Sequence, residues 1–443
     1  MERKFSLIIF LFALSLTVIF LGRAAWAAGN PVLTLEKALE MAGSNNPVLA
    51  AAGERVAQAR ARLEQAAASS LPQLGVSLLY QEVQNEIRYP VLPGGGYAKA
   101  GFESTWKAAL TLNYLLYSGG AVRLNTESKR LALSGVEAQE KRTRQAVEWS
   151  VTGAWYDLRR AEGKLAVAEE VLWLAREHLH HVEALFRNGM VAKNEVLRVQ
   201  VAVSDAELNR IRAENAVEVC WKALERGVGA PLRKTCLLPP REEEPVFSPA
   251  PSDALLIGIR CRPEMEALEK AARSAALASR AARAQGGPQV ALSGELYAAD
   301  EVFFPSKQND WKITLMASWN FFDGGVSSAR EREARAAAEE FFFQAEDMKR
   351  QIELEISVAR LNYESSLQRL HVGRAMVEAA AEDYRMALRR YTAQVGTNID
   401  VLDARVALSN ARNQLVESVY DSLKARAEMD YAMGIIGSTE DGA

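Results

Sequence analysis

An internal repeat with a constant offset constrains the fold more than any other feature of this sequence. Trp106 matches Trp311 and Gly229 matches Gly434, and both pairs differ by 205 positions (311 − 106 and 434 − 229). The same offset relates two further pairs of dipeptides, Gly119-Gly120 with Gly324-Gly325 and Val196-Leu197 with Val401-Leu402. One offset held over this span indicates two copies of a structural unit in the same register.

The repeat divides the chain into predicted segments. The first copy is expected at 28–229, a linker at 230–262, the second copy at 263–434 and a tail at 435–443. Residues 1–27 have the pattern of an export signal: Arg3 and Lys4 precede an apolar stretch that ends near Ala25-Trp26-Ala27. An uncleaved membrane anchor is less favoured, because the apolar stretch is short. No cysteine follows the cleavage site, so no lipid anchor is expected.

The linker is rich in proline and contains the acidic run Glu242 to Glu244, a composition typical of connecting segments. Its apolar cluster Ala254 to Ile259 predicts a short helix. Cys236 and Cys261 flank part of this linker, and a disulfide between them in an oxidising periplasm is left open beside the alternative of free thiols.

Each copy predicts a helix, two strands, a long helix and a further helix. The long helices are expected at about 120–188 and about 326–391, and the helices after them at about 194–226 and about 398–433. A helix of this length extends on the order of 100 Å. Large and small apolar residues alternate along the first long helix at steps of three and four, and this alternation favours tight antiparallel helix packing. The residues of this seam are Val151, Ala154, Leu158, Ala161, Leu165, Ala168, Leu172, Ala175, Leu179 and Val182.

The strands predict a membrane-embedded β part. Hairpins are expected at about 73–117 and about 289–322. In the second hairpin, apolar residues alternate with mostly polar ones. The apolar row has aromatic residues at both ends, as lipid-facing strands do. It consists of Trp311, Ile313, Leu315, Ala317, Trp319 and Phe321. A soluble sandwich would explain one such strand, but not four beside helices of this length. Because four strands cannot close a barrel, subunits must associate, and three chains would give twelve strands around a lumen.

The segment from Arg390 to Ala404, together with Tyr431-Ala432-Met433-Gly434, resembles the signature of TolC-like outer-membrane efflux proteins. The resemblance implies a mainly α homotrimer with a small transmembrane β part: a 12-stranded β-barrel in the outer membrane and a long α-helical barrel in the periplasm. It implies a passive duct of a tripartite efflux or type I secretion system that docks on a periplasmic adaptor and an inner-membrane pump. The family's duct is not an enzyme and needs no cofactor. The net charge of −3 excludes nucleic acid as an expected partner.

The resemblance also assigns residues at the two turns between paired helices, which form the entrance in that family. Asn188, Gly189, Gly396 and Thr397 fall on the adaptor-docking turns, and Asp400 and Asp403 match acidic rings that favour cations. An N-terminal capping or first-turn role for Asp400 is an equally favoured alternative.

Glu195 and Tyr391 match the latch that holds the entrance closed in that family. The latch arginine falls on Gly396, and Gln394 replaces a usual glycine, so the latch either uses Arg390, Lys193 or Arg198 or is weak.

Other chemistry finds little support in the sequence. His178, His180 and His181 do not predict a metal site, because two of them point to different helix faces and no carboxylate has ligand spacing with both; exposed or packed histidines are favoured instead. Gly119, Gly120, Gly324 and Gly325 lack the context of a phosphate loop and are expected to bend the chain between strand and helix. A periplasmic coiled-coil scaffold or adaptor is the alternative function; it would explain the helices but not the alternating strands.

Overall fold

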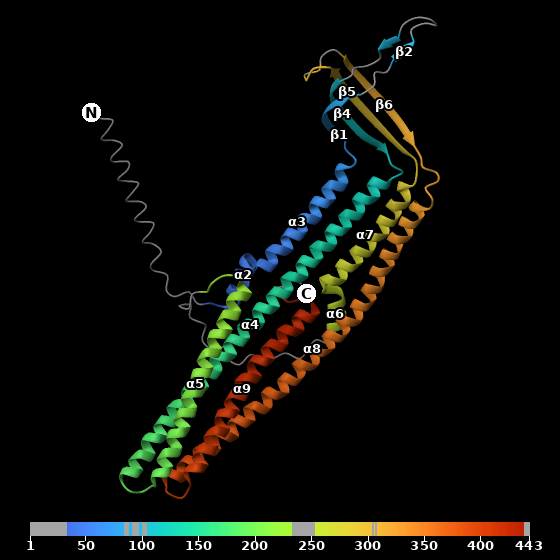
Figure 1. The fold of residues 1–443 in the computed structure, drawn as a ribbon. Helices are drawn as coiled ribbons and strands as arrows, with labels where there is room; N and C mark the ends of the chain where they lie inside the picture. The colour runs from blue at the N-terminus through green and yellow to red at the C-terminus, as the bar shows by residue number, and fades with distance from the viewer. Residues whose placement is uncertain are drawn as a thin grey trace, which may run out of the picture. The chain divides into compact units, whose positions relative to one another are not determined.

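The computed structural model describes residues 33–83, 88–90, 97–99, 104–232, 253–303, 305 and 308–437 (Figure 1). The predicted export signal and most of the linker, including Cys236, lie outside these residues. The proposed pairing of Cys236 with Cys261 is therefore not described, and Cys261 is exposed.

Eight helices of the described residues follow the two copies of the repeat. The long helices are α4 (Ala121–Arg187) and α8 (Val326–Thr392), each of 67 residues, and the helices after them are α5 (Lys193–Val228) and α9 (Asn398–Met433), each of 36 residues. The identical lengths in the two copies are what a duplicated unit requires. The shorter helices are α2 (Leu35–Asn45), α3 (Pro47–Ala68), α6 (Ala254–Cys261) and α7 (Pro263–Gln285).

The four long strands form one antiparallel sheet in the order β1-β4-β5-β6. β1 (Gln73–Glu82) pairs with β4 (Ser104–Tyr117), and β5 (Gln289–Asp300) pairs with β6 (Gln308–Ser318), as the predicted hairpins require. β4 of the first copy also pairs with β5 of the second copy. β2 (Arg88–Pro90) and β3 (Tyr97–Lys99) form a separate two-stranded pair in the long loop of the first copy.

The chain divides into two compact units, which do not coincide with the two copies. One unit comprises residues 1–50, 144–254 and 356–443, and the other comprises 51–143 and 255–355. Each unit therefore takes elements from both copies. The reason is that α4 and α8 each contribute one part to the first unit and another part to the second.

In the first unit, α2, α4 and α5 share an apolar core that contains Ala38, Val151, Leu158 and Leu224, all fully or almost fully buried. The apolar residues of the predicted seam supply the α4 side of this core. At the end of α5, the side-chain amide of Asn46 donates to the backbone oxygen of Gly227 at 2.6 Å. This bond ties the end of α5 to the junction between α2 and α3 in the same copy.

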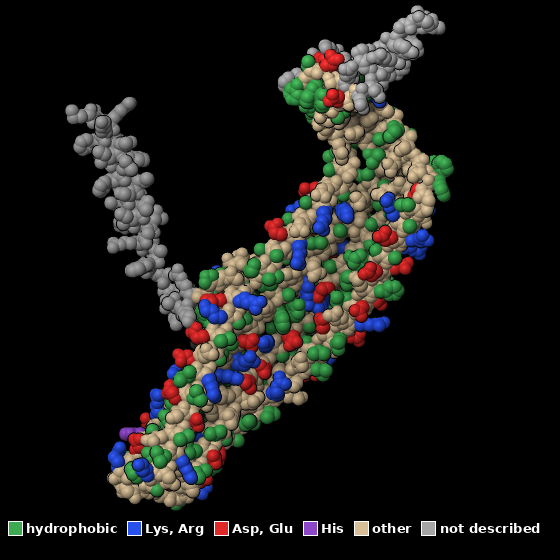
Figure 2. Space-filling model, viewed as in Figure 1, with side chains coloured by type: hydrophobic (Ala, Val, Ile, Leu, Met, Phe, Trp, Pro, Cys, Tyr) green, Lys and Arg blue, Asp and Glu red, His purple; other side chains and the backbone are tan. Residues whose placement is uncertain are grey.

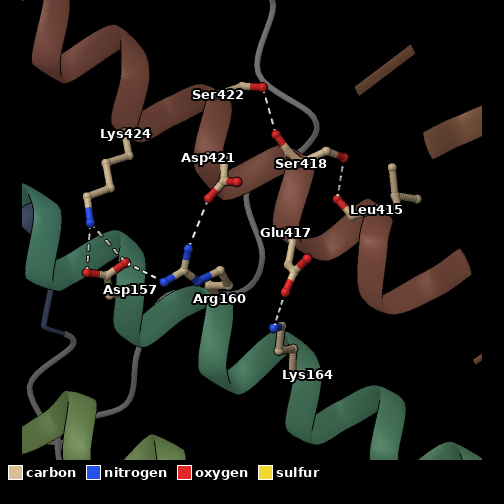
Figure 3. Close-up of polar contacts among 9 residues, drawn as sticks. All are labelled: Asp157, Arg160, Lys164, Leu415, Glu417, Ser418, Asp421, Ser422 and Lys424. Carbon is tan, nitrogen blue, oxygen red and sulfur yellow. Dashed lines mark hydrogen bonds and ion pairs between the residues drawn. The ribbon is translucent and has the colours of Figure 1, made fainter. Parts of the chain in front are cut away.

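Ion pairs join α4 to α9 across the same unit (Figure 3). Asp157 pairs with Lys424 at 3.0 Å, Arg160 pairs with Asp421 at 2.9 Å, and Lys164 pairs with Glu417. The α4 residue numbers rise as the α9 numbers fall, which is the register of antiparallel helices. These side chains are about one-third exposed, so each pair contributes at most about 1 kcal/mol. Their role is to fix the register rather than to supply most of the stability.

In the second unit, small residues let α4 approach α7 closely. The hydroxyl of Ser128 donates to the backbone oxygen of Ser274, and the hydroxyl of Ser274 donates in return to the backbone oxygen of Ser128, both at 2.9 Å. A buried charge cluster follows at one end of α7, where Glu264 pairs with both Arg142 and Arg262. On the face shown in Figure 2, basic and acidic side chains are interspersed over the helices, in keeping with the net charge of −3.

Candidate functional site

The β-sheet of the second unit has one apolar face. Side chains of one strand alternate between the two faces, and the register determines which residues of neighbouring strands share a face. Three cross-strand rows carry the apolar residues on the same face: Val76, Leu110, Leu296 and Trp311; Leu74, Leu112, Gly294 and Ile313; and Tyr114, Leu292 and Leu315. The apolar alternation read from the single strands is thus continuous across all four strands.

The opposite face of the sheet is mostly polar. Lys107 pairs with Glu295 at 2.6 Å and lies over the ring of Tyr297, with its ammonium group 4.5 Å from the ring centroid. The rows on this face contain hydroxyl, amide and charged groups: Gly75, Thr111, Glu295 and Lys312; and Gln73, Asn113, Ser293 and Thr314. A sheet with one apolar and one polar face suits a wall between hydrocarbon and water.

Both outer strands of this sheet have a free edge among the described residues. β1 pairs only with β4, and β6 pairs only with β5. The apolar side chains on these strands are exposed, including Val76 at 84%, Trp311 at 68% and Ile313 at 66%. A free edge beside exposed apolar residues is a surface that another strand can cover.

The glycine pairs lie where strand turns into helix. Gly119, Gly120, Gly324 and Gly325 all have positive φ, between 62° and 93°, which residues with a β-carbon rarely adopt. The residue before each pair caps the following helix: Ser118 Oγ accepts from the backbone of Val122, and Asp323 accepts from the backbones of Gly325 and Ser327. The hydrogen bonds from Ser327 lower the pKa of Asp323.

In the first unit, the turn between α4 and α5 lies beside the turn between α8 and α9 (Figure 1). One apolar cluster there joins all four helices, through Val182 of α4, Val196 of α5, Tyr391 of α8 and Val401 of α9. The two turns also have equivalent backbones. Gly189 has φ 74°, and Gln394, which is 205 positions later, has φ 62° and is the one non-glycine residue with positive φ in the described chain. Gln394 therefore replaces the usual glycine at a position where the backbone conformation favours glycine.

The predicted latch residues come together at these turns. Tyr391 is buried, and the carboxylate of Glu195 lies beside its hydroxyl. Burial and the nearby carboxylate of Glu195 raise the pKa of this hydroxyl. Gly396 leaves little room for the expected arginine, because a β-carbon there would lie 3.0 Å from Arg390 Cβ. Within the described chain, the suggested substitutes Arg390, Lys193 and Arg198 form no ion pair.

Asp400 belongs to a capping box at the start of α9, as the alternative to the lumen role predicts. Thr397 Oγ1 accepts from the backbone of Asp400 at 3.2 Å, and the carboxylate of Asp400 accepts from the backbone of Thr397 at 3.0 Å. These bonds lower the pKa of Asp400. Asp400 and Asp403 are both exposed, so the capping role does not remove either carboxylate from solvent.

The sequence predicts exposed or packed histidines but does not identify which of them is buried or what it contacts. His178 of α4 is 6% exposed, and its Nε2 lies 2.7 Å from Oδ1 of Asn398, which is 4% exposed. Arg405 of α9 is also buried, at 6% exposure. The spacing of His178, three residues after Ala175 and four before Val182, was the available signal that it shares their buried face.

The described residues contain neither a helix that could span a membrane nor a metal-binding cluster. None of these helices combines the length and the apolar character needed to cross a membrane. In the same part of the chain, no three His, Cys, Asp or Glu side chains gather closely enough to hold a metal ion.

Comparison with known proteins places the chain in a family. The family model "Outer membrane efflux protein" matches residues 38–230 and 259–435, the two copies of the repeat. The alkaline protease secretion protein AprF of Pseudomonas aeruginosa is 25% identical over 60% of this chain, and the match covers 56% of AprF, a little over half of its length. The probable efflux pump outer membrane protein TtgC of Pseudomonas putida is 25% identical over 76% of this chain and 70% of its own.

Solved structures share the fold. CusC superposes with a TM-score of 0.76 over 92% of this chain and 94% of its own, at 18% identity. The outer membrane protein VceC of Vibrio cholerae superposes with a TM-score of 0.74 over 90% of this chain and 96% of its own, at 22% identity. These matches confirm the mainly helical fold with a small antiparallel β part. The chain belongs to the outer membrane efflux protein family, which confirms the resemblance to TolC-like proteins and the predicted location in the outer membrane.

Proposed function

We propose that the protein is one subunit of a homotrimeric outer-membrane channel, the exit duct of a tripartite efflux or type I secretion system. The sheet supports this proposal, because it has one apolar face and, among the described residues, a free edge on each of its outer strands. An open edge is not tolerated in hydrocarbon, since each unpaired backbone group would cost several kcal/mol. Association of three sheets, with β6 of one subunit beside β1 of the next, gives twelve strands and no edge.

Twelve strands enclose a lumen, whereas eight would be filled by side chains. The polar face with Lys107, Glu295 and Lys312 then lines the water-filled side, and the row with Ile313 faces lipid. In this arrangement the wall needs no membrane-spanning helix.

The duct is proposed to be passive and to perform no chemistry. Its turns around Asn188, Gly189, Gly396 and Thr397 are proposed to dock on a periplasmic adaptor, which links the duct to an inner-membrane pump. Substrate choice then lies with the pump, whether the cargo is a small molecule or a protein. Asp400 and Asp403 are proposed to form carboxylate rings that favour cations at the entrance. Support comes from the exposure of both side chains beside the turns.

Disulfide trapping of the sheet edges tests the trimer. Cysteines are placed on β1 at Leu74, Val76 or Leu78 and on β6 at Ile313 or Leu315, in a chain whose native cysteines are replaced by serine. At least one combination of β1 and β6 positions should give an oxidised species three times the monomer mass, extracted from outer membranes. The matched control is Leu112→Cys with each β6 cysteine, because β4 has neighbours on both sides. A monomeric, water-soluble protein without pores in planar bilayers would overturn the proposal.

A further inference from the structure

The contact between His178 and Asn398 is a buried polar link between the two copies of the repeat. His178 lies on α4 of the first copy and Asn398 begins α9 of the second, 220 residues later. The ring of His178 also packs edge-on against Tyr391 of α8, with centroids 5.5 Å apart. One imidazole therefore contacts both helices of the second copy at the helix turns. The expected latch arginine is absent at Gly396, and the contact between His178 and Asn398 joins α4 to α9 near this turn.

The hydrogen bond selects the tautomer of the neutral histidine. Oδ1 of Asn398 accepts, so Nε2 of His178 carries the proton. The other ring nitrogen, Nδ1, is buried and has no hydrogen-bond partner among the described residues. A second proton on Nδ1 would have no acceptor, and it would place a positive charge in an apolar cluster.

The charged and titratable groups around His178 do not compensate such a charge. Arg405 from α9 is buried, and its Nη1 is without a hydrogen-bond partner in the described chain. Tyr391 and Tyr384 contribute neutral hydroxyls from α8, and His181 lies on the same helix as His178. The carboxylate from α5, Glu195, lies beside the hydroxyl of Tyr391 and forms no ion pair with His178 or Arg405 within the described residues.

Burial lowers the pKa of His178 most, and the charges of Arg405 and His181 lower it further, against the hydrogen bond to Asn398, which raises it. The histidine is therefore held neutral in this packing. When α9 moves away, the imidazole meets water and regains its ordinary pKa of about 6.5.

We propose that His178 is an acid-sensitive latch of the channel entrance, which holds α4 against α9 when it is neutral and releases α9 when it is protonated. The proposal rests on the channel function proposed above, and it identifies how the entrance of this chain is regulated without the expected arginine.

The sign of the pH effect follows from linkage. The released state binds a proton more readily than the closed state, so closure is strongest above about pH 6.5 and weakens as the pH falls. Each protomer has one His178, so the equilibrium constant for closure of that protomer falls by up to about tenfold per pH unit below about pH 6.5. The weakening ends at the lower pKa of the buried form.

The direct test is titration of the histidines in the full-length protein. The chain has four histidines, so selective labelling with ¹⁵N-histidine gives few NMR signals, and His178→Gln assigns the one of interest. Glutamine keeps a hydrogen-bond donor and has no titration in this range. His180→Gln, which alters an exposed neighbour, is the matched control. We expect the His178 signal to titrate below the ordinary histidine pKa of about 6.5. A His178 signal that titrates at or above that value would overturn the proposal.

Two further readouts follow release. Amide exchange in residues 398–405 should be about tenfold faster in the wild type than in His178→Gln at pH 5, and equal in the two at pH 7.5. Comparison at one pH cancels the intrinsic pH dependence of exchange. In planar bilayers, the open fraction should rise from pH 7.5 to pH 5 for the wild type and His180→Gln, and stay constant for His178→Gln. The same acid response in His178→Gln would overturn the latch.

Asn398→Asp gives the opposite sign and covers the case in which His178→Gln does not fold. The aspartate is nearly isosteric, suits the start of a helix, and supplies a counter-charge for protonated His178. Closure should then persist at pH 5, and acid opening in this variant would contradict the proposal. Absence of pores in every variant at every pH would overturn the channel function, while amide exchange and histidine titration would still decide the latch.

Discussion

Gly229 approaches Asn45 so closely that a β-carbon at position 229 would lie 2.6 Å from the backbone oxygen of Asn45. Gly229 ends α5 with φ 79°, and its amide donates to the backbone oxygen of Glu225. Two requirements for glycine therefore coincide at one residue, a positive φ and a backbone neighbour. Together with the bond from Asn46 to Gly227, this contact determines how the end of α5 meets the junction of α2 and α3.

Gly229→Ala should destabilise the protein more than Gly189→Ala does. Both glycines have positive φ, so both changes introduce backbone strain of about 1 kcal/mol or more. Gly189 has open space where a β-carbon would stand, whereas at Gly229 the backbone must shift, which we expect to raise the cost to about 3 kcal/mol. Thermal unfolding of the purified protein checks the order, and equal midpoints for the two variants would contradict it.

Gln394→Gly should stabilise the turn between α8 and α9 by about 1 kcal/mol. Gln394 has φ 62°, a conformation that costs a residue with a β-carbon about this much relative to glycine. Its equivalent in the first copy, Gly189, already has the preferred residue. A raised thermal midpoint is the expected result. Gln394→Ala, which keeps a β-carbon, is the control and should not raise the midpoint.

Arg262→Leu should destabilise the second unit by about 3–5 kcal/mol. Arg262 is 3% exposed and donates to Glu264 at 2.9 Å and to Glu355 at 2.5 Å. Its removal leaves the carboxylate of Glu264, whose side chain is 14% exposed, with Arg142 as its one ion-pair partner among the described residues, and breaking such a charge network is costly. Glu355→Gln is the control: its side chain is 36% exposed, so we expect a loss of about 1 kcal/mol or less. Chemical denaturation measures both.

Asp403→Ala should lower the cation preference of the pore and leave stability unchanged. Asp403 is exposed, and it forms no hydrogen bond or ion pair within the described residues, so its charge is free to act on passing ions. Replacement of both Asp400 and Asp403 by Ala should lower the preference further. Reversal potentials in planar bilayers under a salt gradient give the measurement, and unchanged selectivity of the double variant would exclude the carboxylate ring.

Asp400→Asn separates capping from charge. Its lowered pKa means that the carboxylate stabilises the start of α9 above the ordinary aspartate value of about 3.9, and that this contribution is lost as the pH falls through the lower pKa. The amide oxygen of asparagine can still accept the hydrogen bond from the backbone of Thr397, so α9 should persist while this acid dependence disappears. Amide exchange of the first turn of α9 between pH 5 and pH 2.5 shows the difference, and Asp403→Asn should leave it unchanged.

Much of the fold could be predicted from the sequence because the relevant signals are local. The periodic apolar residues of α4, the glycine pairs at both strand ends and the alternation around Trp311 each specify an element within a short stretch of chain. The repeat then fixed the equivalence of the copies, and the signature near Arg390 led to the family, which the comparisons confirm.

The histidine latch candidate shows why part of the site could not be predicted. His178 has an ordinary helical environment in sequence, and its partner Asn398 is 220 residues away. The same pattern of histidines suits an exposed cluster equally well. His180 and His181 are exposed and His178 is buried, a difference that depends on where α8 and α9 pack against α4.

The sequence by itself determined the duplicated order of elements, the two apolar faces and the positions of the bends. Only the tertiary structure decided which elements are neighbours: that β4 pairs with β5 across the two copies, that each compact unit mixes both copies, and that His178 meets Asn398. Periodicity states which side of an element must be buried, because it follows from local geometry. It does not state the partner, because four strands with the same alternation fit one another equally well until long-range packing selects one order.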